Sequence, residues 1–232
     1  MRNVDDYIQN YVHKSSQLHA YELANDIWNL LKILYEEGFL RENLRGTSSE
    51  EKREIYVLVE KNADRILASF NKFYDVYMDE KKRKRFFELT RDFGFTEEDL
   101  THLLHTQLMF AFLLNTEAFK NFLTFILKKV SPKSTLGDLL GGNEGILVKQ
   151  TRDNGEAEKI SKRLDINLRN SLAHFTFREE GATICCYNHS KEGNEWSLKE
   201  NKIKSSDLLQ KTMETSLVRA ILASVIADWY GL

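Results

Sequence analysis

Proline and glycine are scarce in this chain and gather in one place, and this restricts the fold more than any other feature. Pro132 is the single proline, and five of the eleven glycines lie in the stretch directly after it, at positions 137, 141, 142, 145 and 155. Both residue types interrupt helices. The distribution therefore predicts long helices with one irregular connection, which contains a short helical turn, between residues 131 and 155.

Apolar spacing and capping residues predict where the helices begin and end. Gly38 should end the first helix, and Ser48 begins a stretch with capping-box spacing. Thr96 is followed by three acids, and Ser205 opens a Ser-Ser-Asp sequence; both patterns are typical of helix N-termini. The predicted helices cover 16–37, about 48–70, 79–92, 96–130, 156–174 and 205–230.

Strand signals are confined to one region. Phe175–Phe177, Ala182–Tyr187 and Trp196–Leu198 are rich in aromatic and β-branched residues or cysteine, and glycine-containing turns separate them. We expect a small β-hairpin at about 175–203. The predicted fold class is therefore an all-α helical bundle with this hairpin as an insertion.

Composition excludes several classes of protein. The net charge is −2, so any nucleic-acid binding must come from a local patch. Cys185 and Cys186 are adjacent, which does not suit a disulfide or a zinc site, so we expect two small apolar side chains in a reducing, cytoplasmic compartment.

No apolar signal segment is seen near the N-terminus. Residues 100–116 lack charged side chains, but His102 and His105 interrupt them, which favours a buried helix over a membrane span.

The helix predicted over 156–174 has two faces when drawn at about 100° per residue. The apolar face should pack on the core and consists of Ile160, Leu164, Leu168, Leu172 and Phe175. The polar face consists of Arg163, Asn167, Asn170 and His174.

Arg169 lies off the polar face, four residues after Asp165 and in reach of an acid–base pair with it. Arg169 and His174 are five residues apart and diverge by roughly 140° around an ideal helix. The same helix from a second copy would bring its own arginine and histidine into a shared groove. If these residues act together, a two-fold homodimer is expected.

The segment Arg169-Asn170-Ser-Leu-Ala-His174 resembles the Arg-Asn-x-x-x-His signature of the HEPN superfamily (higher eukaryotes and prokaryotes nucleotide-binding). The surroundings are similar: a long helix, a Thr-Leu-Gly turn at 135–137, the motif helix, a β insertion and a closing helix. Asp165 stands where many members carry an acid. The resemblance implies an HEPN-like helical domain at 95–232, which commonly dimerises, after an N-terminal helical region at 1–92.

Many HEPN members resemble metal-independent endoribonucleases, often toxins or antiviral-defence effectors, so the resemblance implies RNA cleavage without a metal or cofactor. Histidine is the residue type whose charge changes near neutral pH, so His174 can serve as base or acid. Arg169 has a planar fork that suits a phosphate, Asn170 can orient the imidazole, and Asp165 would aim Arg169. Attack by the 2′-hydroxyl would restrict the substrate to RNA.

Two alternatives remain open for this site. Other HEPN members are non-catalytic and bind nucleotides or partner proteins, so a binding module, with or without an antitoxin as partner, is the second hypothesis. Arg169, Asn170 and His174 can also have a purely structural role near a helix end. Phe175 follows His174 where many members place a small or polar residue, and a bulky ring there would narrow the groove.

Other candidates lie outside the motif. Lys81, Lys82 and Arg83 begin a basic run with aromatics nearby, which can track RNA or form a solvated helix face; Arg163 and Asn167 are further RNA-binding candidates. His102 and His105 have a spacing that metals use, but no third ligand is evident, so core histidines are expected. Residues 141–145 lack the lysine of a phosphate-binding loop.

Overall fold

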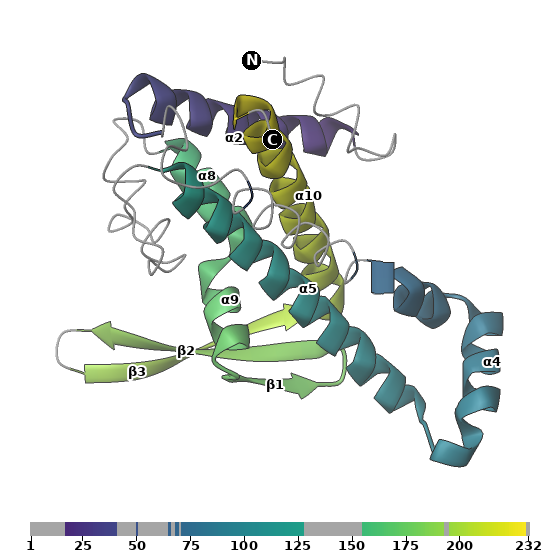
Figure 1. The fold of residues 1–232 in the computed structure, drawn as a ribbon. Coiled ribbons are helices and arrows are strands. Elements are labelled where there is room, and N and C mark those ends of the chain that lie inside the picture. Colours follow the sequence, from purple (N-terminus) through teal and green to yellow (C-terminus); the bar gives the residue numbers. More distant parts are fainter. Residues whose placement is uncertain are drawn as a thin grey trace. The chain divides into compact units, whose positions relative to one another are not determined.

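The computed structural model describes residues 17–40, 71–127, 155–192 and 195–230, with residues 50, 65, 68 and 69 (Figure 1). A 3-10 turn, η1 (Arg91–Phe93), follows the helix that ends at Thr90. The α-helices with defined bounds are α2 (Gln17–Glu36), α4 (Glu80–Thr90), α5 (Glu97–Ile126), α8 (Gly155–Leu164), α9 (Ile166–Ala173) and α10 (Ser205–Tyr230). The helix predicted at about 48–70 and the turn within 131–155 lie outside the described residues, apart from isolated positions.

The helix ends predicted at Gly38, Thr96 and Ser205 are confirmed, whereas the one at Ser48 lies outside the described residues. At the start of α5, Thr96 and Asp99 bond each other reciprocally: the Thr96 backbone N–H donates to Asp99 Oδ2 over 2.8 Å, and the Asp99 N–H donates to Thr96 Oγ1 over 3.2 Å. The Thr96 hydroxyl also donates to Asp99 Oδ2 over 2.6 Å, and this bond, followed by the one from the Thr96 backbone N–H, lowers the pKa of Asp99. Gly38 follows the end of α2 with a φ of 74°, and α10 begins at Ser205.

The predicted all-α class is wrong, because the chain also forms a three-stranded antiparallel sheet in the order β1-β2-β3. The strands are β1 (Phe177–Glu180), β2 (Thr183–Glu192) and β3 (Glu195–Lys204). The fold is mixed, although mostly helical. The sheet lies within the predicted hairpin region, but β2 and β3 pair over ten residues each. A sheet with one solvated face accepts charged residues along its length, so the apolar stretches marked only part of each strand.

The described residues form two compact units that alternate along the chain. We call the first the helical unit; it takes its residues from Met1–Glu60, Asn115–Ile166 and Met213–Leu232. The second, the sheet unit, takes its residues from Lys61–Leu114 and Asn167–Thr212. Neither unit coincides with the predicted regions 1–92 and 95–232, and the extent of an HEPN-like domain stays a prediction.

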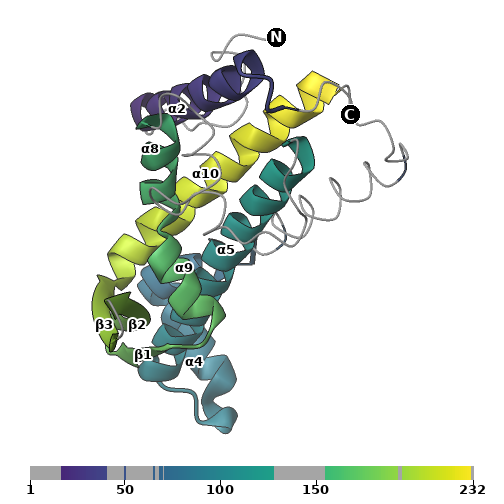
Figure 2. The same cartoon turned by 90° about the vertical axis from the view of Figure 1, so that its left-hand side faces the viewer.

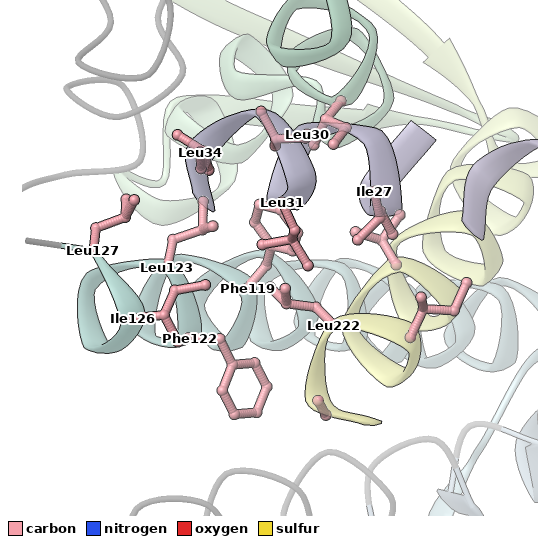
Figure 3. Packing of buried hydrophobic residues seen from close by; sticks show 14 of the residues in the cluster. Ile27, Leu30, Leu31, Leu34, Phe119, Phe122, Leu123, Ile126, Leu127 and Leu222 are labelled. Carbon is pink, nitrogen blue, oxygen red and sulfur yellow. The ribbon is translucent and has the colours of Figure 1, made fainter. Parts of the chain in front are cut away.

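The core of the helical unit is almost entirely aliphatic and aromatic. Leucines and an isoleucine on one side of α2 meet α5, as Figure 3 shows for Leu31, Phe119 and Leu123. Ile160 and Leu164 of α8 join the same core and are fully buried. This confirms the apolar face predicted for that part of the helix.

The core of the sheet unit joins α5, α9, the sheet and the start of α10. Leu168 and Leu172 of α9 pack with Phe112 of α5 and with Ile184 and Cys186 of β2. Both views of the fold show α9 beside the sheet (Figures 1 and 2). This packing fixes the helix that carries the motif.

Two further features follow from the described residues. Cys185 and Cys186 are both buried in β2 and form no disulfide, as predicted. Burial is the main cause that raises the pKa of the Cys185 thiol, and a hydrogen bond to Glu180 is the second. This thiol is therefore a poor nucleophile. None of the helices in the described part of the chain has a stretch long and apolar enough to cross a bilayer.

Candidate functional site

The motif lies on a short helix and not on the long one that the sequence predicted. α8 ends at Leu164, Asp165 has a φ of 44°, and α9 begins at Ile166. Aspartate tolerates this left-handed conformation better than most residues, because its short side chain can hydrogen-bond locally. A continuous wheel over 156–174 is therefore wrong, and Arg163 does not share a helix with Asn170 and His174.

The apolar residues of α9 are buried, and its polar motif residues are at least partly exposed, as a ligand-binding site requires. Leu168 and Leu172 are buried in the sheet unit's core, whereas Arg169 and Asn170 are half-buried. His174 comes directly after the last residue of α9 and is exposed. The apolar side of this short helix thus anchors it, and its polar side reaches solvent.

A hydrogen bond brings the guanidinium of Arg169 toward the predicted polar face. Arg169 Nη1 donates to Asn170 Oδ1 over 3.0 Å. The backbone N–H of His174 donates to the carbonyl of Asn170 over 3.0 Å, so these two residues lie one turn apart. Asn170 is therefore the link between Arg169 and the turn that carries His174, and the arginine's reach reduces the divergence expected from an ideal helix.

The end of α9 is closed by two backbone bonds in the Schellman pattern. The Thr176 N–H donates to the Ser171 carbonyl over 2.9 Å, and the Phe175 N–H donates to the Leu172 carbonyl over 3.3 Å. This pattern requires a left-handed residue at Phe175, whose φ is 56°. Glycine usually occupies that position, because it has no side chain to clash with the backbone.

Phe175 does not join the core, so its predicted place on the apolar face is wrong. Its side chain is 84% exposed. The helix ends at Ala173, and the positive φ of Phe175 turns the chain away from the direction that a longer helix would have followed. The strand that was predicted to begin at Phe175 begins at Phe177 instead.

The turn after α9 is fastened to β2. The Thr176 hydroxyl donates to the Tyr187 carbonyl over 2.7 Å, and the Tyr187 N–H donates to the Thr176 carbonyl over 2.7 Å. The Ser171 hydroxyl donates to the same Tyr187 carbonyl over 3.2 Å. His174 and Phe175 therefore lie between two anchored points, Ser171 and Thr176, in a fixed backbone.

Three other predicted site residues lie around α8 and α9. Arg163 is half-buried, and its Nη2 contacts Asp26 Oδ2 at 3.2 Å, so this guanidinium has a structural partner in the helical unit. Asn167 is exposed on α9, and its carbonyl accepts a bond from Ser171. Asp165 lies in the turn between the helices, and its predicted role of aiming Arg169 stays a prediction.

The basic run lies at the start of α4 and is only partly available to a ligand. Asp75 pairs with Lys82, and Arg83 Nη1 donates to the Tyr77 carbonyl over 2.8 Å. Lys81 is exposed. The pocket beside this segment has mixed charge, being lined by Glu80, Arg83, Lys84, Phe87, Glu88, Arg91 and Glu97. The acids weaken the attraction of this pocket for phosphate. This favours a solvated helix face for the basic run, with Lys81 as the cation most available to RNA.

A buried polar network that the sequence did not predict lies in the sheet unit. His105 is 1% exposed, and its Nδ1 lies 3.1 Å from Glu179 Oε2 while its Nε2 lies 2.5 Å from Ser205 Oγ. His102, expected in the core, is exposed and contacts Glu179 Oε1 at 3.0 Å. The residues come from α5, β1 and α10, which are far apart in the chain, so sequence spacing could not reveal them.

The order serine, histidine, carboxylate is that of a hydrolase triad, but the geometry of this network is structural. His105 is 1% exposed, so a substrate does not reach its imidazole. The Ser205 hydroxyl also lies 2.9 Å from the Ala182 carbonyl, which ties it to the turn before β2. The buried imidazole of His105 therefore serves to join α5 to the start of α10. Among the described residues no group of three or more metal-ligating side chains suits a metal ion.

Comparison with known protein families, curated proteins and solved structures finds no match for this chain.

Proposed function

We propose that the chain is a metal-independent endoribonuclease of the HEPN type that acts as a homodimer, in the role of a toxin or antiviral-defence effector. The observation that supports this most is the grouping at the end of α9. The Arg169 guanidinium bonds Asn170, and Asn170 is one turn from the exposed His174. The grouping places a permanent cation and an imidazole on one short, anchored segment, as cleavage of a phosphodiester requires.

The proposed reaction uses the 2′-hydroxyl of the substrate as nucleophile. A neutral His174 takes the 2′-hydroxyl proton while the 2′-oxygen bonds the adjacent phosphorus. The bond from phosphorus to the 5′-oxygen then breaks, and that oxygen receives a proton from an imidazolium. The products are a 2′,3′-cyclic phosphate and a 5′-hydroxyl end. Arg169 neutralises charge on the phosphoryl oxygens during this step.

A homodimer explains how one histidine per chain serves both proton transfers. His174 of one copy acts as base, and His174 of the second copy acts as acid. The exposed end of α9 is compatible with such a meeting, because His174 is not buried by its own chain. Asp165 would aim Arg169 in this arrangement, and Lys81 would contact RNA phosphates outside the cleaved linkage. We place the activity in the cytoplasm, where Cys185 and Cys186, which form no disulfide, would stay reduced.

The direct test is cleavage of a single-stranded RNA in the presence of EDTA. The wild-type chain should cut RNA and leave DNA of the same sequence intact. His174→Ala and Arg169→Ala should each lower the rate by about a hundredfold or more, because each removes a group that acts on the reacting atoms. His102→Ala removes another exposed histidine of the sheet unit and should retain the wild-type rate.

Two results would contradict the proposal. Cleavage that stops with EDTA would show that a metal performs the chemistry, and cleavage that persists in His174→Ala would exclude this imidazole. No cleavage of any RNA by a folded wild-type dimer would favour the second hypothesis, a binding module. In that case Arg169→Ala should abolish capture of a protein partner such as an antitoxin.

A further inference from the structure

We propose that Phe175 is a stacking platform for an unpaired RNA base next to the cleaved phosphate, so the substrate is single-stranded RNA. The inference rests on the proposed function and extends it to the class of RNA. It begins from a conflict between residue type and position. A phenylalanine that is 84% exposed occupies a backbone conformation, with a φ of 56°, that favours glycine.

The same chain shows what this position usually requires. α2 ends with the same two bonds: the Phe39 N–H donates to the Leu34 carbonyl, and the Gly38 N–H donates to the Tyr35 carbonyl. The left-handed residue there is Gly38, with a φ of 74°. At α9 the equivalent residue is Phe175, so a capping role alone does not explain the choice of a large aromatic.

The surrounding bonds hold this unfavourable conformation in place. Thr176 is tied to Tyr187 through its hydroxyl, its carbonyl and the Tyr187 N–H, and Ser171 is tied to the same strand. Strained conformations persist where their surroundings determine them, and they concentrate at functional sites. The ring is therefore presented to solvent by a rigid turn, which lowers the entropy lost when a ligand binds to it.

The neighbours of Phe175 indicate the ligand. His174 precedes it directly, so their Cα atoms are about 3.8 Å apart. The Arg169 guanidinium, bonded to Asn170 on the same helix, supplies a cation for a phosphate. An aromatic ring and a phosphate-binding cation carried by the same helix and its closing turn match one nucleotide unit, in which a flat base accompanies each phosphate.

Stacking also restricts the form of the RNA. Bases inside a duplex already stack on each other, whereas the bases of loops and single strands are free to stack on a side chain. Stacking on an aromatic ring tolerates every base, because each has a π-face. The inference therefore predicts preference for unpaired RNA with little selection for sequence at this base.

The test measures binding of a fluorescent 2′-O-methyl RNA strand, which cannot be cleaved because its 2′-oxygen is blocked. Phe175→Gly should weaken binding by about tenfold, within the range for loss of one base–aromatic stack. The substitution suits the backbone at this position, so the variant should fold. Phe110→Ala removes another exposed aromatic of the sheet unit and should leave affinity unchanged.

Phe175→Trp provides a fluorescence signal that separates stacking on RNA from a purely structural role of this position. Its indole should keep the affinity for RNA, and its fluorescence should be quenched when the unpaired strand binds. The wild-type chain, which contains three tryptophans elsewhere, supplies the background for this difference. A perfectly paired RNA duplex should bind more weakly and leave the indole fluorescence unchanged.

The remaining outcomes distinguish failure of the stacking platform from failure of the proposed function. Equal affinity of Phe175→Gly and wild type, in a chain that still cleaves RNA, would overturn the stacking platform and leave the proposed function standing. If Phe175→Gly instead converts a dimer to monomers in sedimentation, the ring contacts a second copy, which also overturns the inference. A wild-type chain that neither binds nor cleaves RNA would refute the proposed function, and the inference with it.

Discussion

The backbone at Phe175 makes a quantitative prediction about stability that does not depend on function. The comparison is between Phe175→Gly and Phe175→Ala. Both variants remove the ring, so the contacts of the ring cancel in the difference. What remains is the positive φ of 56°, which alanine must still adopt and which glycine adopts freely.

The magnitude follows from two opposing contributions. A left-handed conformation costs an L-residue about 1–2 kcal/mol. Glycine loses more backbone freedom on folding, which costs about 0.5–1 kcal/mol relative to alanine. The glycine variant should therefore be more stable than the alanine variant by about 0.5–1 kcal/mol. In a chain of this size that difference raises Tm by about 1–4 °C.

Gly38 provides the reverse experiment in the same chain. It occupies the equivalent position after α2 with a φ of 74°, and no heavy atom lies within 4 Å of a Cβ added there. Gly38→Ala should thus lower stability by about 0.5–1 kcal/mol through backbone strain alone.

Urea unfolding followed by circular dichroism measures both differences. Phe175→Gly should exceed Phe175→Ala in stability by about as much as Gly38→Ala falls below the wild type. That agreement would support the same capping geometry at both helix ends. If Phe175→Gly is less stable than Phe175→Ala, then glycine adds entropy to the unfolded chain without relieving strain. That result would refute the left-handed conformation at Phe175.

Three other predictions concern how the fold is held together. Leu172→Ala should lower the free energy of unfolding by about 2–5 kcal/mol in urea titrations, because this side chain is 2% exposed in the sheet unit's core; a change below about 1 kcal/mol would contradict that packing. Thr176→Val should cost about 1 kcal/mol and speed amide exchange at Tyr187, since it removes the hydroxyl bond to β2; unchanged exchange would show that the turn is not fastened there. Thr96 lowers the pKa of Asp99, so the stability this carboxylate contributes is present above its ordinary pKa and is lost as pH falls through the lowered value. Asp99→Ala should therefore destabilise at pH 7 more than at pH 2, and an equal effect at both pH values would exclude the ionised cap.

The helices with strong local signals could be predicted from the sequence. Gly38, Thr96 and Ser205 marked helix ends correctly, because capping depends on residues within a few positions of each other. The region of the sheet was also predicted. Its length was not, because exposed charged residues of β3 such as Lys199, Glu200 and Lys202 carry no apolar signal.

The parts that the sequence did not predict depend on contacts between distant segments. The break at Asp165 and the turn at Phe175 replace one long helix with two shorter ones, although the apolar pattern continues through both. His105 finds its partners on β1 and α10, more than seventy residues away. A helical wheel treats each helix alone, so it placed Phe175 in the core.

The central claim is that His174 and Arg169 cleave RNA by attack of its own 2′-oxygen, and the chemistry of the product ends tests this most directly. Mass spectrometry of RNA fragments made in EDTA should find 2′,3′-cyclic phosphates paired with 5′-hydroxyl ends, and none of these fragments with His174→Ala. Fragments with 3′-hydroxyl and 5′-phosphate ends would show that water, not the 2′-oxygen, attacked the phosphate, and would contradict the proposed mechanism.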